Sequence, residues 1–352
     1  MESPERSTVR SAASDERLEA ALDAVLDPDM TAVPEGFVVL ADTGSRIHFL
    51  DWGAPDARAR PVVGPLHGAL LVHGIGQTAW TWTPVARRTR RLTHVVAMDL
   101  RGHGLSDSPV DGYEAGPLGA DVVAVAEGSG LLSGMAVASE GRSPAVVLAG
   151  HGFGAIVAVW GAAALGDRCA GLVLVDGGWE RVEEVSGLDI AEFLRTMDEP
   201  PEILASMAAY LADRRAFDPA TWDQDQERAA RATVVETAAG KVVPATRPHA
   251  LVASVEAMFD YDPAAALAAI DVPVVALVAR DDTGGRRGTA LASVQEVRRA
   301  AGRSAIEVVD LGGLGHNLPR YRPVDVSAAV LRLAAWGGGD PRALRGTIAD
   351  EP

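Results

Sequence analysis

Residues 145–165 read AVVLAGHGFGAIVAVWGAAAL, and this stretch decides the fold. Its first part, 145–149, is a short, continuous and largely β-branched apolar run, which is typical of a strand buried on both faces. The glycines that follow allow a tight turn, because glycine adopts backbone conformations that other residues avoid. The apolar, alanine-rich remainder is typical of a buried helix. The stretch therefore predicts a strand, a sharp turn and a helix.

The turn itself, Gly150-His151-Gly152-Phe153-Gly154, has the frame of a nucleophile elbow, G-x-S-x-G, with Gly152 where a serine is expected. The central residue of an elbow has a strained backbone, which costs about 1–3 kcal/mol for a residue with a Cβ and which glycine avoids. Gly152 would therefore keep the turn and remove the nucleophile. A serine-to-glycine change introduced to trap a substrate would give the same sequence.

The same letters also match a second motif. Gly150-x-Gly152-x-x-Ala155, after a strand and at the start of a helix, has the form of the dinucleotide fingerprint G-x-G-x-x-G/A. Asp176 lies at the end of the next predicted strand, about where an acid that binds ribose would stand. This unit is ambiguous by itself, and its neighbours in the chain have to decide between the two motifs.

The segment HGIG at 73–76 favours the elbow, because it follows the apolar run 69–72. Its turn can direct the backbone N–H of Ile75 at a developing oxyanion. The N–H of Phe153, at the start of the helix, supplies a second donor. Ile75 and Phe153 are therefore the predicted oxyanion hole.

Further segments complete the pattern. RGHGLSDSP stands at 101–109, Asp281 and Asp282 follow an apolar run, and His316 stands in a GHN triplet after another apolar run. The chain order elbow, acid, histidine is the order that accompanies a G-x-S-x-G motif. The group of motifs is more specific than any one of them.

Over residues 37–336 these segments resemble the α/β-hydrolase superfamily, in the lidded branch that includes epoxide hydrolases, prolyl aminopeptidases and carbon–carbon bond hydrolases. The resemblance implies an α/β-hydrolase fold: a mostly parallel eight-stranded sheet, helices on both faces and an inserted helical cap. It also implies that His316 is the catalytic base and that Asp282, or Asp281 in its place, orients it. Members of the family carry Ser, Asp or Cys where this chain has Gly152.

The chain is organised as alternating strand and helix patterns, which predict a mostly parallel sheet covered on both sides. The predicted strands are 37–40, 47–52, 69–72, 94–97, 145–149, 172–175, 272–278 and 306–309, and the main predicted helices are 80–91, 118–132, 153–165 and 324–336. The predicted divisions are an N-terminal extension with a short helix (1–34), the hydrolase core (35–179 and 269–336), a helical cap insert (180–268) and a flexible tail (337–352).

Several side chains near the motifs carry a second interpretation. Gly74, His151 and Trp179 are the candidate binding residues, although the position of His151 is usually structural in the family. Asp176 is interpreted as a strand-end cap rather than an alternative triad acid. His73 and His103 lie in predicted turns without metal-ligand spacing, and Cys169 is interpreted as a small core residue. We expect neither a metal nor a cofactor.

Charge and composition limit the partners. The 352 residues carry a net charge of −16, which disfavours nucleic acid and anionic membrane surfaces. Cys169 is the only cysteine, so no intrachain disulfide can form, and the N-terminus lacks the shape of a signal peptide. These features favour a cytoplasmic protein with a small-molecule substrate, and they leave the oligomeric state open.

Three functions are compatible with the sequence. The first is a hydrolase-like enzyme, with lyase or cyclase chemistry also open, that acts on a small apolar carbonyl compound such as an ester, a lactone or a polyketide-like intermediate. It would use the His316–Asp282 dyad and the oxyanion hole without an acyl-enzyme. The second is an inactive, ligand-binding homologue. The third is an NAD-binding oxidoreductase, which would make the other motifs coincidental.

Overall fold

The computed structural model describes residues 27–55, 66–133, 144–279, 285–313 and 315–335. Its centre is an eight-stranded sheet in the order β1-β2-β4-β3-β5-β6-β9-β10. All strands from β4 to β10 in this order are parallel, and only β2 runs antiparallel to its two neighbours. The strands are β1 (Glu35–Leu40), β2 (Arg46–Asp51), β3 (Gly68–Val72), β4 (Val95–Met98), β5 (Val146–His151), β6 (Cys169–Val175), β9 (Val274–Val278) and β10 (Glu307–Asp310).

The central strands are buried on both faces, as their continuous apolar runs predict. In β3, Leu70 and Val72 belong to one hydrophobic core, and Ala69 and Leu71 belong to the core on the opposite face of the sheet. The alternation follows from the two-residue period of a strand. The predicted strands are confirmed, with ends that differ by a few residues.

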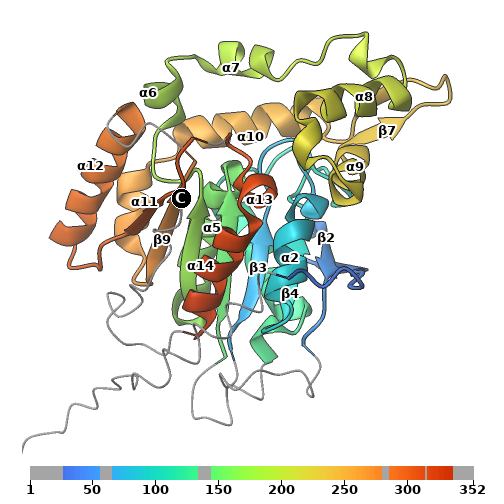
Figure 1. The fold of residues 1–352 in the computed structure, drawn as a ribbon. Coiled ribbons are helices and arrows are strands. Elements are labelled where there is room, and N and C mark those ends of the chain that lie inside the picture. The colour runs from blue at the N-terminus through green and yellow to red at the C-terminus, as the bar shows by residue number, and fades with distance from the viewer. Residues whose placement is uncertain (1–26, 56–65, 134–143, 280–284, 314, 336–352) are drawn as a thin grey trace, which may run out of the picture.

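Two layers of helices cover the sheet (Figure 1). One core joins the sheet to α3, α5, α11 and α12, and the other joins it to α2 and α14. The fold class predicted from the sequence is therefore confirmed. These helices are α2 (Thr83–Thr89), α3 (Ala115–Gly128), α5 (Phe153–Leu165), α11 (Pro263–Ala269), α12 (Arg286–Ala300) and α14 (Pro323–Ala335).

The segment between β6 and α11 lies across one end of the sheet (Figure 1). It holds helices α6 (Val182–Ser186), α7 (Ile190–Thr196), α8 (Met207–Phe217), α9 (Gln224–Ala232) and α10 (Pro248–Asp260). It also holds a short antiparallel pair, β7 (Val234–Glu236) and β8 (Val242–Pro244), which the helical pattern did not predict. The valines of this pair favour strands, and Gly240, with φ +76°, allows the turn between them.

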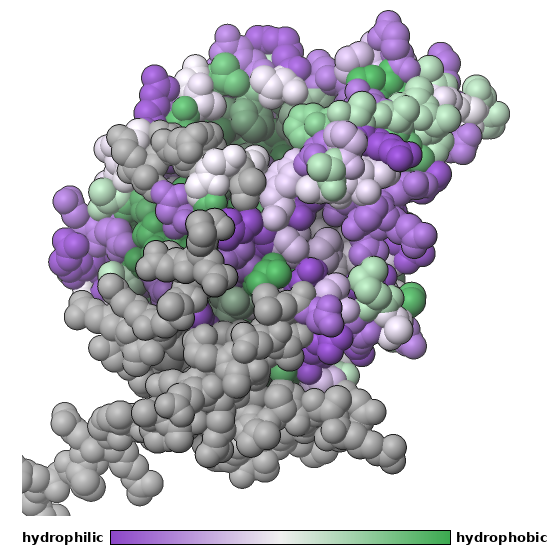
Figure 2. Space-filling model, in the orientation of Figure 1, coloured by the Kyte–Doolittle hydropathy of each residue, from purple (hydrophilic) through white to green (hydrophobic). Residues whose placement is uncertain are grey.

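The boundary of this segment differs from the predicted cap in one respect. Helix α11 begins within the predicted range 180–268, yet Leu267 is fully buried in the core beside the sheet. Figure 2 shows hydrophobic residues gathered over the end of the segment that carries α8 and β7. Phe217 and Val235 are exposed apolar residues of these elements.

Several sequence predictions fall partly or wholly outside the described residues. These are the short N-terminal helix, the tail 337–352, and both Asp281 and Asp282. Within the described ranges, no helix combines the length and the apolar character needed to cross a bilayer.

The turn between β5 and α5 is very closely packed. A Cβ on Gly150 would lie 2.1 Å from the carbonyl oxygen of Gly154, and a Cβ on Gly154 would lie 2.3 Å from the carbonyl oxygens of Val72 and His73. These neighbours are backbone atoms of adjacent strands and turns, so they cannot move independently of the sheet. The outer glycines of the motif are therefore needed for packing.

We expect Gly154→Ala to lower the free energy of unfolding by about 1–3 kcal/mol, because overpacking forces the backbone apart. Gly116→Ala is the matched control, because Gly116 lies in α3 with nothing within 4 Å of the added Cβ. The control should be neutral or slightly stabilising. Urea denaturation followed by circular dichroism measures both, and equal effects of the two changes would contradict the packing argument.

Candidate active site

Gly152 occupies the turn in a conformation that disfavours any residue with a side chain. Its φ is +54° and its ψ is −117°, and its N–H donates to the carbonyl oxygen of Val175 at 3.1 Å. A Cβ at this position would lie 3.1 Å from Nε2 of His316 and, apart from the neighbours of Gly152 in the chain, would meet no other described residue within 4 Å. The fold thus brings the empty elbow position and the predicted base together.

His316 is oriented by a carboxylate. Its Nδ1 lies 2.5 Å from Oδ2 of Asp176, which stands at the end of β6. The other oxygen, Oδ1, accepts from the backbone N–H of Ala279 at 3.0 Å and from Nη1 of Arg287 at 2.8 Å. Because an ionised carboxylate only accepts hydrogen bonds, Nδ1 carries a proton, and in the neutral ring Nε2 presents a lone pair toward Gly152.

The strand-end cap predicted for Asp176 is only part of its role. Asp176 does cap the chain at Ala279, but it also holds His316, and it fills the place expected of Asp282. Asp282, with Asp281 as its alternative, lies outside the described residues. The resemblance in the sequence favoured Asp282 over Asp176, and the structure shows that the end of β6, which is adjacent and parallel to β9, brings Asp176 to His316.

Arg287 supplies a positive charge next to the Asp176–His316 pair. Its Nη1 contacts Asp176, its Nη2 lies 3.0 Å from Oε1 of Glu180, and its guanidinium lies over the ring of Trp179. Burial alone would raise the pKa of Asp176, but the hydrogen bond to His316 and the charge of Arg287 outweigh it and lower the pKa to about 2. Asp176 therefore stays ionised throughout the range in which a histidine titrates.

Two backbone amides face the site as predicted oxyanion donors. Phe153 is the first residue of α5, so its N–H has no acceptor within the helix. The Ile75 turn is held on both sides, since Gly74 N–H donates to Oε1 of Gln77 and Gly76 N–H donates to Nε2 of His103, each at 3.1 Å. In the described part of the chain, the N–H groups of Ile75 and Phe153 donate to no other backbone acceptor. Both remain available for an oxyanion.

The three candidate binding residues have different positions. Gly74 and His151 line the cavity beside Gly152. His151 stacks on the ring of His316 at 4.5 Å and donates from Nε2 to the backbone carbonyl of His316 at 3.0 Å. Burial lowers the pKa of His151 to about 3, so this ring stays neutral and supports the loop. Trp179, by contrast, is buried in the core with the guanidinium of Arg287 over its ring, and it is not among the described residues that line this cavity.

The cavity at the elbow has a volume of about 380 Å³. His316 is accessible from it, because 61% of the His316 side chain is exposed. Apolar side chains from α5 and from the segment above the sheet form much of its wall, namely Ile156, Val182, Val185, Phe193 and Met258. Within the described ranges, no group of metal-ligating side chains forms a metal site. The site can therefore bind an apolar group next to a base and two amide donors.

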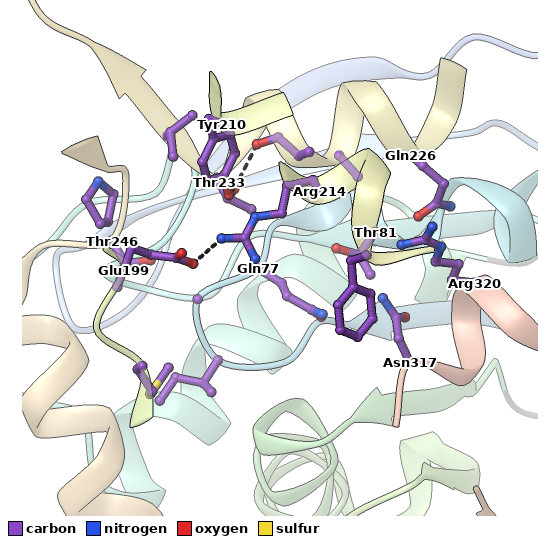
Figure 3. A pocket seen from close by; sticks show the side chains of 18 of the residues that line it. Gln77, Thr81, Glu199, Tyr210, Arg214, Gln226, Thr233, Thr246, Asn317 and Arg320 are labelled. Carbon is purple, nitrogen blue, oxygen red and sulfur yellow. Dashed lines mark hydrogen bonds and ion pairs between the residues drawn. The ribbon is translucent and has the colours of Figure 1, made fainter. Parts of the chain in front are cut away.

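A second cavity of about 430 Å³ adjoins the first, with Ile75 and Gln77 in the walls of both. Figure 3 shows polar side chains around it, contributed by the segment above the sheet and by the loops of the core. Sequence reasoning missed this second space, because its residues come from distant parts of the chain.

Comparisons with known proteins identify the family of the fold. A family model described as the alpha/beta hydrolase family matches residues 69–330. A 2-(acetamidomethylene)succinate hydrolase of Mesorhizobium japonicum is 33% identical over 45% of this chain and 51% of its own length. An N-formylmaleamate deformylase of Pseudomonas putida is 34% identical over 38% of this chain and 42% of its own length. The chain thus spans about half or less of the curated relatives that it matches.

Solved structures share the fold. A crystal structure of E-2-(acetamidomethylene)succinate hydrolase superposes with a TM-score of 0.61 at 21% identity, covering 85% of this chain and 98% of the other. The thioesterase domain from the curacin biosynthetic pathway gives 0.59 at 20% identity, covering 85% and 99%. At these identities the likeness establishes the architecture alone.

We expect Asp176→Asn to lower the free energy of unfolding at neutral pH by about 2 kcal/mol, the value that corresponds to a pKa depressed from 3.8 to about 2. A carboxyl group with a depressed folded pKa stabilises the protein above its unfolded pKa and loses this effect as the pH falls through the folded pKa. The loss relative to the parent should therefore shrink by about half near pH 3.

Urea denaturation at neutral and acidic pH measures this difference. Asp271→Asn is the control, because Asp271 forms an ion pair with Arg303 on the surface, where its side chain is 71% exposed. Exposed pairs contribute about 0–1 kcal/mol, so the control should change little. A pH-independent loss in Asp176→Asn would contradict the assignment of the charge.

Proposed function

The chain belongs to the alpha/beta hydrolase family, and we propose that it is an enzyme of this family in which His316 acts as a general base without a covalent intermediate. The observation that carries the proposal is the placement of His316. Its Nδ1 is bound to Asp176, while its Nε2 faces the position at Gly152 where the family has a nucleophile.

In the proposed reaction a water molecule takes the place of the missing side chain. Nε2 of His316 accepts a proton from this water as its oxygen attacks the carbonyl carbon of the substrate. The carbonyl oxygen becomes an oxyanion, and the N–H groups of Ile75 and Phe153 stabilise it. The oxyanion then collapses, the bond between the carbonyl carbon and the leaving group breaks, and protonated His316 gives its proton to the leaving group; Asp176 stabilises the imidazolium in between.

The apolar wall of the first cavity supports a substrate whose carbonyl is attached to an apolar group, as in an ester, a lactone or a polyketide-like compound. Elimination, cyclisation and carbon–carbon cleavage also begin with a proton transfer that Nε2 can perform, so the same site suits a lyase or cyclase. The names of the relatives, a hydrolase and a deformylase, support hydrolysis as the first expectation.

Gly152 favours a second candidate, an inactive homologue that binds a ligand in the same cavity. The retained contact between Asp176 and His316 supports the enzyme instead, because ligand binding alone does not require an oriented base. An NAD-binding protein has less support. Asp176, which would bind the ribose, already uses both oxygens for contacts with His316, Arg287 and Ala279.

We expect the parent protein to hydrolyse small lactones or activated esters in a steady state without a burst, and His316→Gln to lose about 10²–10⁴-fold in rate, the usual contribution of a general base. Spectrophotometric assays on a panel of such compounds measure this. His249→Gln is the control, because His249 contacts the loop at Ser108 and Pro109, away from Gly152. Turnover that is absent or insensitive to His316→Gln would support the inactive homologue.

Gly152→Ser should create a nucleophile next to Nε2 of His316 and add a burst of p-nitrophenol release that the parent lacks. Gly152→Ala is the matched control, because it introduces the same backbone strain, about 1–3 kcal/mol, without a hydroxyl group. In the Gly152→Ser background, Asp176→Asn should abolish the burst and Asp282→Asn should retain it. If instead Asp282→Asn abolishes the burst and Asp176→Asn retains it, Asp282 is the residue that orients His316. A folded Gly152→Ser variant without a burst would contradict the assignment of residues 150–154 as a nucleophile elbow.

A further inference from the structure

We propose that the second cavity binds a carboxylate group of the substrate, and that Arg320 is the residue that recognises it. The inference rests on the proposed function only in taking the bound molecule to be the substrate. It refines the apolar carbonyl compound proposed above, because it adds a negative charge at the end of the molecule remote from the reacting carbonyl.

The first observation concerns the hydrogen bonds of Arg320. The residue belongs to the short helix α13 (Leu318–Tyr321), and its Nε donates to Oγ1 of Thr221 at 2.6 Å. Its Nη2 donates to the backbone carbonyl of Asp218 at 2.8 Å. Among the described residues, Nη1 has no acceptor. A guanidinium has five N–H donors, so most of the donors of Arg320 remain available to a ligand.

The second observation concerns charge. Arg214, the other arginine in the wall, is neutralised by an ion pair with Glu199, as Figure 3 shows. Arg320 forms no ion pair with any described residue. The half-buried carboxylate of Asp218 interacts with this charge: its pKa is lowered mainly by the hydrogen bond from Thr221 and to a smaller extent by the charge of Arg320. The cavity therefore carries one positive charge that the described residues leave without a direct counter-ion.

Neutral amides surround this charge. In Figure 3, Gln226 and Asn317 lie beside Arg320 at the side of the cavity opposite Glu199. The Oδ1 atom of Asn317 is buried and has no hydrogen-bond partner among the described residues. Asn317 lines this cavity, and its Nδ2 group can donate a hydrogen bond to a ligand. A carboxylate is the planar acceptor that a guanidinium binds best, with two parallel hydrogen bonds.

The third observation ties the second cavity to the reaction. Helix α13 begins two residues after His316, and the N–H of Leu318 donates to the carbonyl oxygen of His316 at 2.9 Å. Ile75, the predicted oxyanion donor, lines both cavities. A molecule that places its carbonyl at Ile75 can therefore extend a few bonds toward Arg320. Arg320, which would recognise the carboxylate, and His316, the proposed base, thus belong to one short segment of the chain.

The same contacts give Arg320 a second possible role, as a tether between α13 and the segment above the sheet through Thr221 and Asp218. A tether would affect all ligands alike, whereas a carboxylate site distinguishes a charged ligand from a neutral one of the same shape. The experiment therefore compares such pairs and measures binding rather than turnover, so that its outcome is independent of whether the proposed reaction occurs.

The probes are the monomethyl esters of succinic, glutaric, adipic and suberic acid, each compared with its dimethyl ester. Isothermal titration calorimetry measures both members of each pair with the parent protein. We expect at least one monoester to bind about tenfold more tightly than its diester, a typical effect of a charge-assisted hydrogen bond. Arg320→Gln should abolish this preference while leaving the binding of the neutral diester nearly unchanged.

Two further variants separate charge from folding. Arg320→Lys keeps the positive charge and loses the planar fork, so it should retain part of the preference even if Arg320→Gln folds poorly. The double variant Glu199→Gln/Arg214→Gln removes the neutral ion pair of the same cavity and should retain the full preference. The proposal is overturned if no monoester is preferred by the parent, if the preference survives Arg320→Gln, or if Arg320→Gln weakens both esters equally.

Discussion

The carboxylate of Asp176 is the group on which the site depends. It lies at the end of β6 with its side chain almost fully buried, and it receives hydrogen bonds from three separate parts of the chain. A buried ionised carboxylate is stable only when such donors compensate for the loss of water. The donors supply this compensation, and in turn the carboxylate fixes each of them. His316 is oriented over Gly152 because its Nδ1 is one of these donors.

This arrangement explains how a site without a nucleophile can remain organised. In a triad of the usual kind the base is held on one side by the carboxylate and on the other by the nucleophile. Here the contact at Gly152 is missing, and the remaining support comes from Asp176 on one side and from the ring of His151 on the other. His151 also holds the backbone of His316. The imidazole is thus positioned without the missing side chain.

The two adjoining cavities divide recognition between them. The wall of the first is largely apolar and contains the base, so it suits the reacting end of a molecule. The second has amides and the cation Arg320, so it suits a polar end. Ile75 and Gln77 stand between them. Because Ile75, the predicted oxyanion donor, lines both cavities, the proposed substrate would extend from one cavity into the other with its carbonyl group at Ile75.

Much of the fold could be predicted from the sequence, because it depends on local patterns. Continuous apolar runs identify strands buried on both faces, and Gly150, Gly152 and Gly154 identify a turn too close for side chains. These features place each motif after a predicted strand and reveal the order of the motifs along the chain. That order identifies His316, Ile75 and Phe153 as candidate site residues. The short pair β7–β8 was missed, since its few residues lie among helices and carry little pattern of their own.

Only the tertiary structure decided which acid meets the base and what surrounds the substrate. The resemblance in the sequence favoured Asp282, which lies outside the described residues, whereas the structure places the carboxylate of Asp176, at the end of β6, on Nδ1 of His316. The contact between Asp176 and His316 depends on side-chain geometry and on Arg287, which also binds Asp176 although the two residues are far apart in the chain. The second cavity is likewise assembled from residues far apart in the chain, and long-range contacts of this kind leave no periodic signal in a sequence.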